Sequence, residues 1–294
     1  MNKVIINMGF AIMLLAYSVL AFSGGEQGLT KENINDFDSN GWTPLMSFVN
    51  ERVSRNADAR MKELQALFDL GADPNIRSKN DRNDTAYTLI LQPGMNTRVV
   101  SALVKNGADV NQFDGRGQID FHRYVKKPEL LETILKAGLN PNGSGSKTSN
   151  RTFLQDAIAE ENYDAVKLLL QYGADPNEAK ERALSPLYRS FKIPDLRYMT
   201  ILIEHGASIH GNKSISGSLT KKNNKAIIEL LIAKGADVSE VDENGNTPLH
   251  YAYLHLKRGK DMLPVIEFLM LKGANMKIKN KAGQLPNEMK LRRK

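Results

Sequence analysis

The chain has no cysteine among its 294 residues, and only one tryptophan and five histidines. The missing cysteine excludes disulfide bonds, thiolate metal ligands, thiol catalysis and a lipidated cysteine. The histidines do not follow the helical spacing of a metal site, and there is neither a Gly-x-Ser-x-Gly nucleophile motif nor a phosphate-binding loop. We therefore expect no catalytic residue, no metal ligand and no cofactor, and we predict that the protein is not an enzyme.

What the sequence contains instead is a repeat that ends in glycine. The repeated glycines are Gly71, Gly107, Gly138, Gly173, Gly206, Gly235 and Gly273. They are 36, 31, 35, 33, 29 and 38 residues apart, and each follows an apolar run with helical spacing. Glycine suits the end of a helix because it adopts the left-handed conformation without steric cost. A period near 33 residues predicts a stack of helical units rather than one globular core.

A second motif marks where each unit begins. Thr43-Pro44, Ser185-Pro186 and Thr247-Pro248 each combine a capping hydroxyl with a proline that the first helical turn tolerates. Each unit therefore reads as a turn, a short first helix, a second helix and a glycine. His205 lies in the last turn before Gly206, where it suits the end of a helix.

The segment from Asp242 to Ala252 closely resembles the signature of the ankyrin repeat. The resemblance implies an all-α fold: an ankyrin-repeat solenoid of about seven helix–turn–helix units with a partial C-terminal cap. It also implies that His250 joins the turn to the helix by hydrogen bonds. We assign residues 1–23 to a signal peptide, 24–34 to a linker, 35–280 to the repeats and 281–294 to a basic cap or tail.

Two units are longer than the family pattern, in which 21 residues separate the threonine position from the glycine. Thr43 lies 28 residues before Gly71, and Thr247 lies 26 residues before Gly273. We expect the extra residues to lengthen a helix or the loop between the two helices. The sixth unit, which ends at Gly235, keeps little of the first-helix motif, so we expect it to open most easily.

The N-terminal residues have the pattern of a secretory signal peptide. Lys3 precedes an uncharged stretch over residues 4–22, and Ala21 and Ser23 supply the small residues that signal peptidase reads. We predict cleavage after Ser23 and a bacterial periplasmic location. The alternatives are a secreted protein and an uncleaved anchor in the inner membrane, since about 20 apolar residues suffice to span a bilayer.

The formal net charge of +7 is concentrated at the C-terminus. Residues 277–294 contain seven basic residues and one acidic residue, which gives +6. We interpret this segment as a solvated cap, with attraction to an anionic membrane or to an acidic partner as the alternative. No aromatic–basic stripe indicates nucleic-acid binding. We expect a monomer whose partner is a protein.

In ankyrin-like stacks, the turns project as fingers and the first helices line a concave face, and partners usually bind to both. Tryptophan, tyrosine and arginine dominate such interfaces. Carrying these positions over gives a list of candidate partner-binding residues: Trp42, Phe113, Arg116, Phe121, Tyr124, Arg151, Arg189, Lys192, Lys213, Lys221 and Tyr251. For Trp42 and Phe121, packing between repeats is the alternative.

These observations predict an exported, non-catalytic module that clamps one specific protein through its concave face. The family resemblance implies one specific version of this interpretation, because exported bacterial ankyrin proteins of this kind include immunity proteins that neutralise a toxin. The alternatives are a secreted effector that binds host proteins and a membrane-anchored scaffold.

Overall fold

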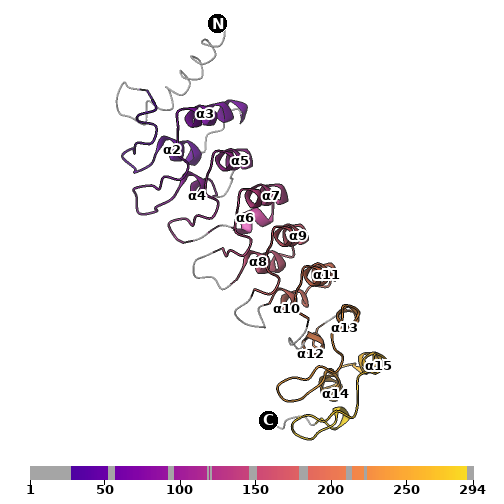
Figure 1. Cartoon of the computed structure of the whole chain (residues 1–294). Helices are drawn as coiled ribbons and strands as arrows, with labels where there is room; N and C mark the ends of the chain where they lie inside the picture. Colours follow the sequence, from indigo (N-terminus) through magenta and orange to yellow (C-terminus); the bar gives the residue numbers. More distant parts are fainter. Residues whose placement is uncertain are drawn as a thin grey trace. The chain divides into compact units, whose positions relative to one another are not determined.

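The fold was analysed in a computed structural model, in which all regular secondary structure of the described residues is helical (Figure 1). The described residues are 28–51, 57–91, 96–117, 119, 121–145, 151–178, 185–209, 214–221 and 224–289. The predicted signal peptide lies outside them. Within these ranges no helix is long and apolar enough to span a membrane. The chain divides into two compact units, residues 1–149 and residues 150–294.

The first unit contains three helix pairs. They are α2 (Pro44–Asn50) with α3 (Ala57–Asp69), α4 (Ala86–Ile90) with α5 (Thr97–Lys105), and α6 (Phe121–Val125) with α7 (Pro128–Lys136). The second helices pack in sequence, α3 on α5 and α5 on α7, and α2 packs on α4. Figure 1 shows the second helices in one row and the first helices in another, with the loops projecting beside the first helices.

The second unit contains four pairs and a short 3-10 helix. They are α8 (Phe153–Ala159) with α9 (Tyr163–Gln171), α10 (Pro186–Ser190) with α11 (Arg197–Glu204), α12 (Ser214–Ser218) with α13 (Asn224–Ala233), and α14 (Pro248–Lys257) with α15 (Leu263–Leu271). The 3-10 helix η2 (Pro286–Glu288) packs on α14 and covers the end of its row. The helix pairs predicted from the repeat are therefore confirmed.

The seven repeat glycines all take the left-handed conformation, with φ between 86° and 99°. They stop the second helices as predicted, because other residues would be strained there. The two long units also behave as expected. Helix α3 has 13 residues and α14 has 10, whereas α9 has 9 and α8 has 7.

The predicted helix starts and the role of His250 are confirmed. The hydroxyls of Thr43 and Ser185 accept hydrogen bonds from the N–H groups of Met46 and Tyr188. His250 is fully buried, and its Nδ1 accepts the Thr247 N–H at 3.1 Å. Its Nε2 donates to the Gln284 carbonyl oxygen at 3.0 Å, so His250 also joins α14 to the next loop. His205 closes α11 through a 2.8 Å contact from Nδ1 to the Ile201 carbonyl oxygen.

Asparagine side chains clasp consecutive repeats together. In each clasp, the asparagine four residues after a repeat glycine donates to the carbonyl of the next repeat glycine and accepts an N–H two residues beyond it. Asn75 bonds Gly107 and Asp109 in this way, each at 2.8 Å. Asn111 and Asn177 form the same two bonds with the repeats that follow them. This explains the asparagine that recurs after Gly-Ala-Asp.

The sixth repeat lacks this clasp, because serine replaces the asparagine. Ser239 accordingly makes no clasp to Gly273 among the described residues, although its N–H bonds Asp237. The missing clasp gives a physical reason for the sixth unit to open more easily than the others. That this unit opens most easily stays a prediction.

Candidate protein-binding surface

Side chains from three consecutive repeats meet on the first-helix side of the second unit. They are Arg151, Tyr188, Arg189 and Lys221, which we call the arginine–tyrosine surface, and the predicted residue Lys192 follows α10 close by in the sequence. Arg151 precedes the α8 cap Thr152, Arg189 lies in α10, and Lys221 closes the turn after α12 by donating its N–H to the Ser218 carbonyl. Because α8 packs on α10, residues of consecutive repeats become neighbours.

Asp156 in α8 forms an ion pair with Arg151 and acts electrostatically on Arg189. The distance from its Oδ1 to Arg151 Nε is 2.9 Å, and the two side chains are 42% and 28% exposed. Burial lowers the pKa of Arg189, the positive charge of Arg151 lowers it further, and Asp156 partly offsets both effects. Two guanidinium groups are thus gathered close enough to repel each other, with Asp156 acting on both.

Tyr188 forms the aromatic part of the surface. Its Cε2 lies so close to Gly217 of α12 that a Cβ there would come within 3.2 Å of it, so the ring rests on the backbone of the next repeat. The Lys221 ammonium is 5.0 Å from the ring centroid, and the ring of Phe191 is 5.6 Å away. Tyr188 is half-buried, while Lys192 is exposed. The ring is therefore fixed, whereas the lysine is open to solvent.

Tyr251 lies further along the same unit, on α14, and it is held by its own repeat. Its hydroxyl donates a short hydrogen bond to the Asp242 carboxylate. Burial and this bond raise the pKa of Tyr251 to about 12. Burial opposes ionisation of Asp242, but the hydrogen bonds from Tyr251 and from the Asn246 and Asn244 N–H groups lower its pKa overall. Tyr251 is half-buried and serves to anchor the seventh finger.

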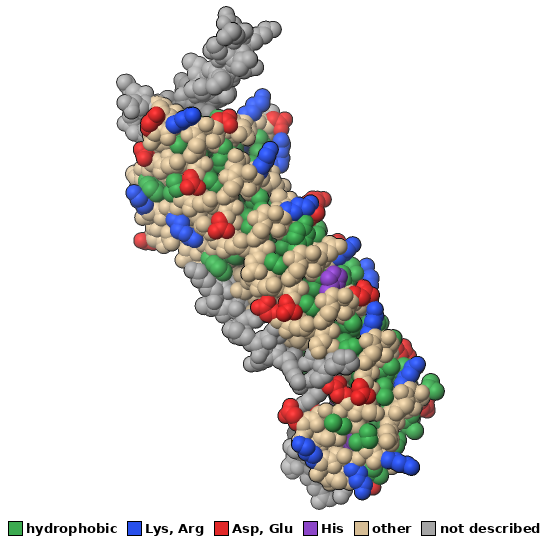
Figure 2. Space-filling model, viewed as in Figure 1, with side chains coloured by type: hydrophobic (Ala, Val, Ile, Leu, Met, Phe, Trp, Pro, Cys, Tyr) green, Lys and Arg blue, Asp and Glu red, His purple; other side chains and the backbone are tan. Residues whose placement is uncertain are grey.

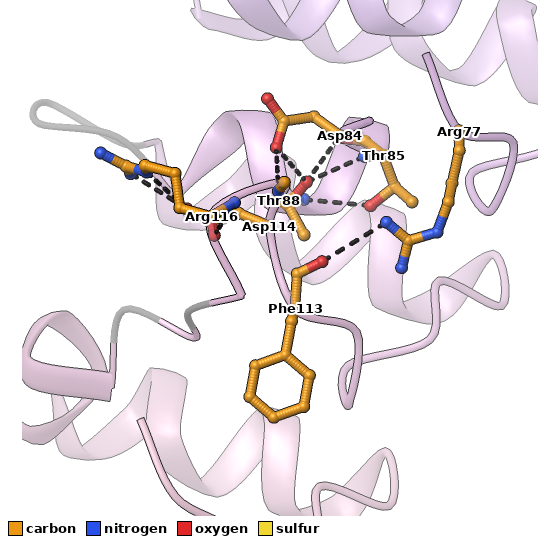
Figure 3. Close-up of polar contacts among 8 residues, drawn as sticks. Arg77, Asp84, Thr85, Thr88, Phe113, Asp114 and Arg116 are labelled. Atoms are coloured by element: carbon orange, nitrogen blue, oxygen red, sulfur yellow. Dashed lines mark hydrogen bonds and ion pairs between the residues drawn. The ribbon is translucent and has the colours of Figure 1, made fainter. Parts of the chain in front are cut away.

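In the first unit, the predicted residues Phe113 and Arg116 belong to a finger that is tied to its neighbour. The Gly115 N–H donates to Asp84 at 3.2 Å, and Arg77 Nη1 donates to the Phe113 carbonyl at 3.5 Å. Figure 3 shows the Phe113 ring pointing away from these polar contacts. Arg116 pairs with Asp114 at 2.9 Å, yet its side chain stays 81% exposed.

Trp42, the single tryptophan, is half-buried at the base of the first finger. Its backbone N–H and C=O both bond Asp38, which closes the turn. The indole Nε1 is buried, and no acceptor among the described residues bonds it. Both open interpretations, packing and partner contact, are compatible with this half-buried position.

Two of the predicted contact residues are in the core, so that part of the prediction is wrong. Phe121 is 2% exposed and Tyr124 is fully buried. Their rings meet edge to face at 6.4 Å, and the Tyr124 hydroxyl lies 2.9 Å from that of Tyr87 in the preceding repeat. The cause is a late start of α6, which begins at Phe121 rather than beside Gly117, so the family positions do not carry over here. Lys213 lies outside the described residues.

The described residues include no group of three or more His, Asp or Glu side chains that could hold a metal ion. His255 is 8% exposed, and no partner in the described residues bonds its Nδ1. Burial and the nearby charges of Lys260 and Arg258 lower the pKa of His255, so its neutral form is favoured.

Three surface features of the structure were missing from the sequence prediction. Tyr188 and Asp156 belong to the arginine–tyrosine surface, and both occupy first-helix positions that the repeat register could have indicated. The third is on α15, where Leu263, Met270 and Leu271 are 55%, 48% and 81% exposed. On the face shown in Figure 2, basic and acidic side chains are otherwise interspersed.

Two segments of the sequence match family models: residues 149–181 match the ankyrin repeat, and residues 218–270 match ankyrin repeats in many copies. The chain is an ankyrin-repeat protein. The helix pairs, the left-handed glycines and the His250 bonds agree with this assignment. Ankyrin repeats form protein–protein interaction modules, and the family indicates that coarse function for this ankyrin-repeat protein.

Its relatives come from very different organisms. Human ankyrin repeat and SOCS box protein 3 is 30% identical over 165 residues, which are 53% of this chain and 32% of that protein. Protein PhlB of Serratia liquefaciens is 26% identical over 156 residues, which are 50% of this chain and 66% of that protein. The chain thus spans less than two thirds of each relative. The crystal structure of EF0377, an ankyrin-repeat protein, is 20% identical with a TM-score of 0.48, over 57% of this chain and 88% of that one.

Proposed function

We propose that this ankyrin-repeat protein is an exported bacterial binding module that clamps one specific protein without catalysis. The observation that carries the proposal is the arginine–tyrosine surface of the second unit. Half-buried arginine and tyrosine are the residues from which interface hot spots are most often built. Here Asp156 and the Gly217 backbone hold them in place before any partner arrives.

Such preorganisation favours tight and selective binding. A long side chain that is already ordered loses less conformational entropy when the partner binds. Arg189 and Tyr188 are adjacent in the short helix α10, whose proline and serine cap fix its start. The surface is therefore suited to a specific partner rather than to loose, nonspecific association.

The location that we propose is the bacterial periplasm, and the role is that of an immunity protein that neutralises a toxin. The support for export is the pattern of Lys3, the uncharged stretch over residues 4–22, and the small residues before the predicted cleavage point. The support for a neutralising role is the resemblance to exported ankyrin proteins together with a binding surface that carries no evident chemistry.

Location is tested by cell fractionation and N-terminal sequencing of the protein from its native host. A periplasmic protein that begins at Gly24 is the expected result. An intact N-terminus in the membrane fraction would instead support an anchored scaffold, and mature protein found only in the medium would support a secreted effector.

Binding is tested by affinity purification from the periplasm, with mass spectrometry to identify the partner. The variant Arg151→Ala/Arg189→Ala should recover much less of the partner than the native protein does. Arg197→Ala is the matched control, because Arg197 is an exposed arginine on the second helix α11 that pairs with Asp195 at 2.7 Å. If the partner is a toxin, co-expression should rescue cell growth, and failure of rescue would refute the immunity role.

A further inference from the structure

We propose that the protein forms a homodimer in which helix α15 packs antiparallel on α15 of a second copy. The contact is made by the side of α15 that carries Leu263, Met270 and Leu271, which we call the end face. This inference does not depend on the proposed function, because the arginine–tyrosine surface lies on the first-helix side of the unit. A dimer also differs from the monomer expected from the sequence.

The end face is apolar but open to solvent. Leu271 is 81% exposed, and Leu263 and Met270 are 55% and 48% exposed. The opposite side of the same helix is also apolar and packs in the core through Val265, Ile266 and Leu269. A helix that is apolar on every side is normally covered on every side, because apolar area left in water is unfavourable. The end face therefore lacks a cover.

Leu263 lies at a position that contacts the next repeat elsewhere in the second unit. It is ten residues before its repeat glycine, as Tyr163 of α9 is before Gly173. The ring of Tyr163 packs edge to face on Tyr198 of the next second helix, α11, with the centroids 5.4 Å apart. No second helix follows α15 in the part of the chain that the structure describes, so Leu263 stays exposed.

Met270 and Leu271 face the same way. Two residues before the glycine, where α15 has Leu271, α11 has Glu204, whose carboxylate lies 3.1 Å from the ammonium of Lys234 at the end of the next second helix. Three residues before the glycine, where α15 has the exposed Met270, the earlier repeats of the second unit have apolar residues that are buried or half-buried: Leu170, Ile203 and Ile232. The end face is thus the stacking side of an ordinary repeat.

The two rows of helices end differently. The 3-10 helix η2 packs on α14 and covers the last of the first helices. Figure 1 shows α15 at the end of the row of second helices, and among the described residues no helix covers its end face. Terminal repeats of solenoids normally present a polar outer face. Because α15 instead keeps the apolar side that stacks on a following helix, we infer that a helix covers it in solution.

The chain itself supplies a helix of the required kind. The cover must present apolar side chains along one helical side, and the end face of a second copy does so. The described residues expose one other large hydrophobic side chain, Val241 in the loop before α14. An isologous pair joins the same patch of both copies and closes, so that neither end face remains open.

The spacing of the apolar residues favours an antiparallel pair. Leu263 is seven and eight residues before Met270 and Leu271, which is about 10–12 Å along a helix. When two such helices run in opposite directions, Leu263 of each copy lies opposite Met270 and Leu271 of the other. The positive end of each helix dipole then lies beside the negative end of its partner, which is favourable.

Glu267 sets a limit on the strength of this dimer. It is exposed and lies midway between Leu263 and Leu271, four residues from each. In the antiparallel pair, the two Glu267 carboxylates lie near the two-fold axis, where like charges repel. The dimer should therefore dissociate on dilution, and removing this charge should tighten it.

The experiment measures the mass of the protein by analytical ultracentrifugation from low to high micromolar concentration. The protein is purified from its native host, so that it carries the processing that the cell performs. The native protein should change from monomer to dimer as the concentration rises. Leu263→Asp/Leu271→Asp should raise the dissociation constant at least about tenfold, because it places charge in the apolar contact.

Two further variants separate loss of the contact from loss of the fold. Val241→Asp is the matched control, because it makes the same change at an exposed apolar residue of the same unit, and it should stay within about twofold of the native protein. Glu267→Gln should lower the dissociation constant about two- to fivefold, a gain that an unfolded variant would not produce. Circular dichroism and thermal unfolding check each variant.

Four results would overturn the proposal. They are a native protein that is monomeric at every concentration, equal dimerisation of the native and Leu263→Asp/Leu271→Asp proteins, an equal loss in Val241→Asp, and weaker dimerisation of Glu267→Gln. A monomeric protein that captures a different protein, or sediments with phosphatidylglycerol vesicles, only when Leu263 and Leu271 are intact would also overturn it, since the end face would then have another occupant. Capture that depends on Arg151 and Arg189 would still support the proposed function in each of these cases.

Discussion

Replacing Asn75 by alanine should weaken the first unit by removing a clasp between two repeats. The substitution deletes two hydrogen bonds of 2.8 Å, one to the Gly107 carbonyl and one from the Asp109 N–H. A net contribution of about 0.5–1.5 kcal/mol for each bond gives about 1–3 kcal/mol in total. Because water can reach both backbone groups after the change, the lower half of this range, about 1–2 kcal/mol, is expected.

The assay is urea unfolding followed by tryptophan fluorescence. Trp42 is the single tryptophan and lies in the first unit, so its emission reports that unit directly. With a slope of about 2 kcal/mol per molar urea, the midpoint should fall by about 0.5–1 M at unchanged slope. Gln65→Ala is the control, because Gln65 bonds Asp69 within the same helix and such pairs contribute only about 0.2–0.5 kcal/mol. An Asn75→Ala midpoint no lower than that of the control would refute the clasp.

Three further predictions concern other parts of the chain. Ser239→Asn should introduce the missing clasp to Gly273 and raise the free energy of unfolding of the second unit by about 1 kcal/mol. Urea unfolding followed by circular dichroism measures this change, and no increase would contradict the clasp geometry. Gly115→Ala should destabilise the first unit by more than about 2 kcal/mol, because the new Cβ would lie 1.3 Å from the Arg82 carbonyl oxygen. The control is Gly28→Ala, whose Cβ would meet nothing within 4 Å and which should have little effect in the same tryptophan-fluorescence assay. Because the folded-state pKa of His255 is lowered, the unfolded chain binds the proton more readily, and stability should fall as the pH drops below about 6.5. In thermal melts between pH 5 and 7.5, His255→Leu should make stability depend less on pH. An unchanged pH dependence in this variant would argue against the role of His255.

The repeat could be read from the sequence because its signals are local. Glycine is required wherever φ is positive, and a hydroxyl followed by proline starts a helix wherever it occurs. These rules located the second-helix ends at Gly71 and Gly273 and the cap at Thr247. The repeat register also placed α8 beside α10, and this packing brings Arg151 and Arg189, which lie 38 residues apart, to the same side of the unit.

The features that were missed depend on contacts rather than on local signals. The third unit has no hydroxyl followed by proline before its first helix, so no local signal in its sequence marked Phe121 as the first residue of α6. Arg60 is a second example, because a charged residue rarely lies in the core. It is 9% exposed, and its Nη2 donates to the carbonyls of Phe48 and Glu51 at 2.8 and 2.9 Å. Those bonds satisfy the end of α2, which only the folded chain reveals.

The central claim is that this ankyrin-repeat protein binds its partner through the first-helix side of its second unit. The most direct test is to titrate the partner identified by periplasmic capture against the native protein, Arg151→Ala/Arg189→Ala and Arg197→Ala by isothermal titration calorimetry. We predict that the double variant loses at least about 2 kcal/mol of binding free energy, a value typical of hot spots, while Arg197→Ala binds like the native protein. Equal affinity of all three proteins, with circular dichroism showing that each is folded, would contradict the claim.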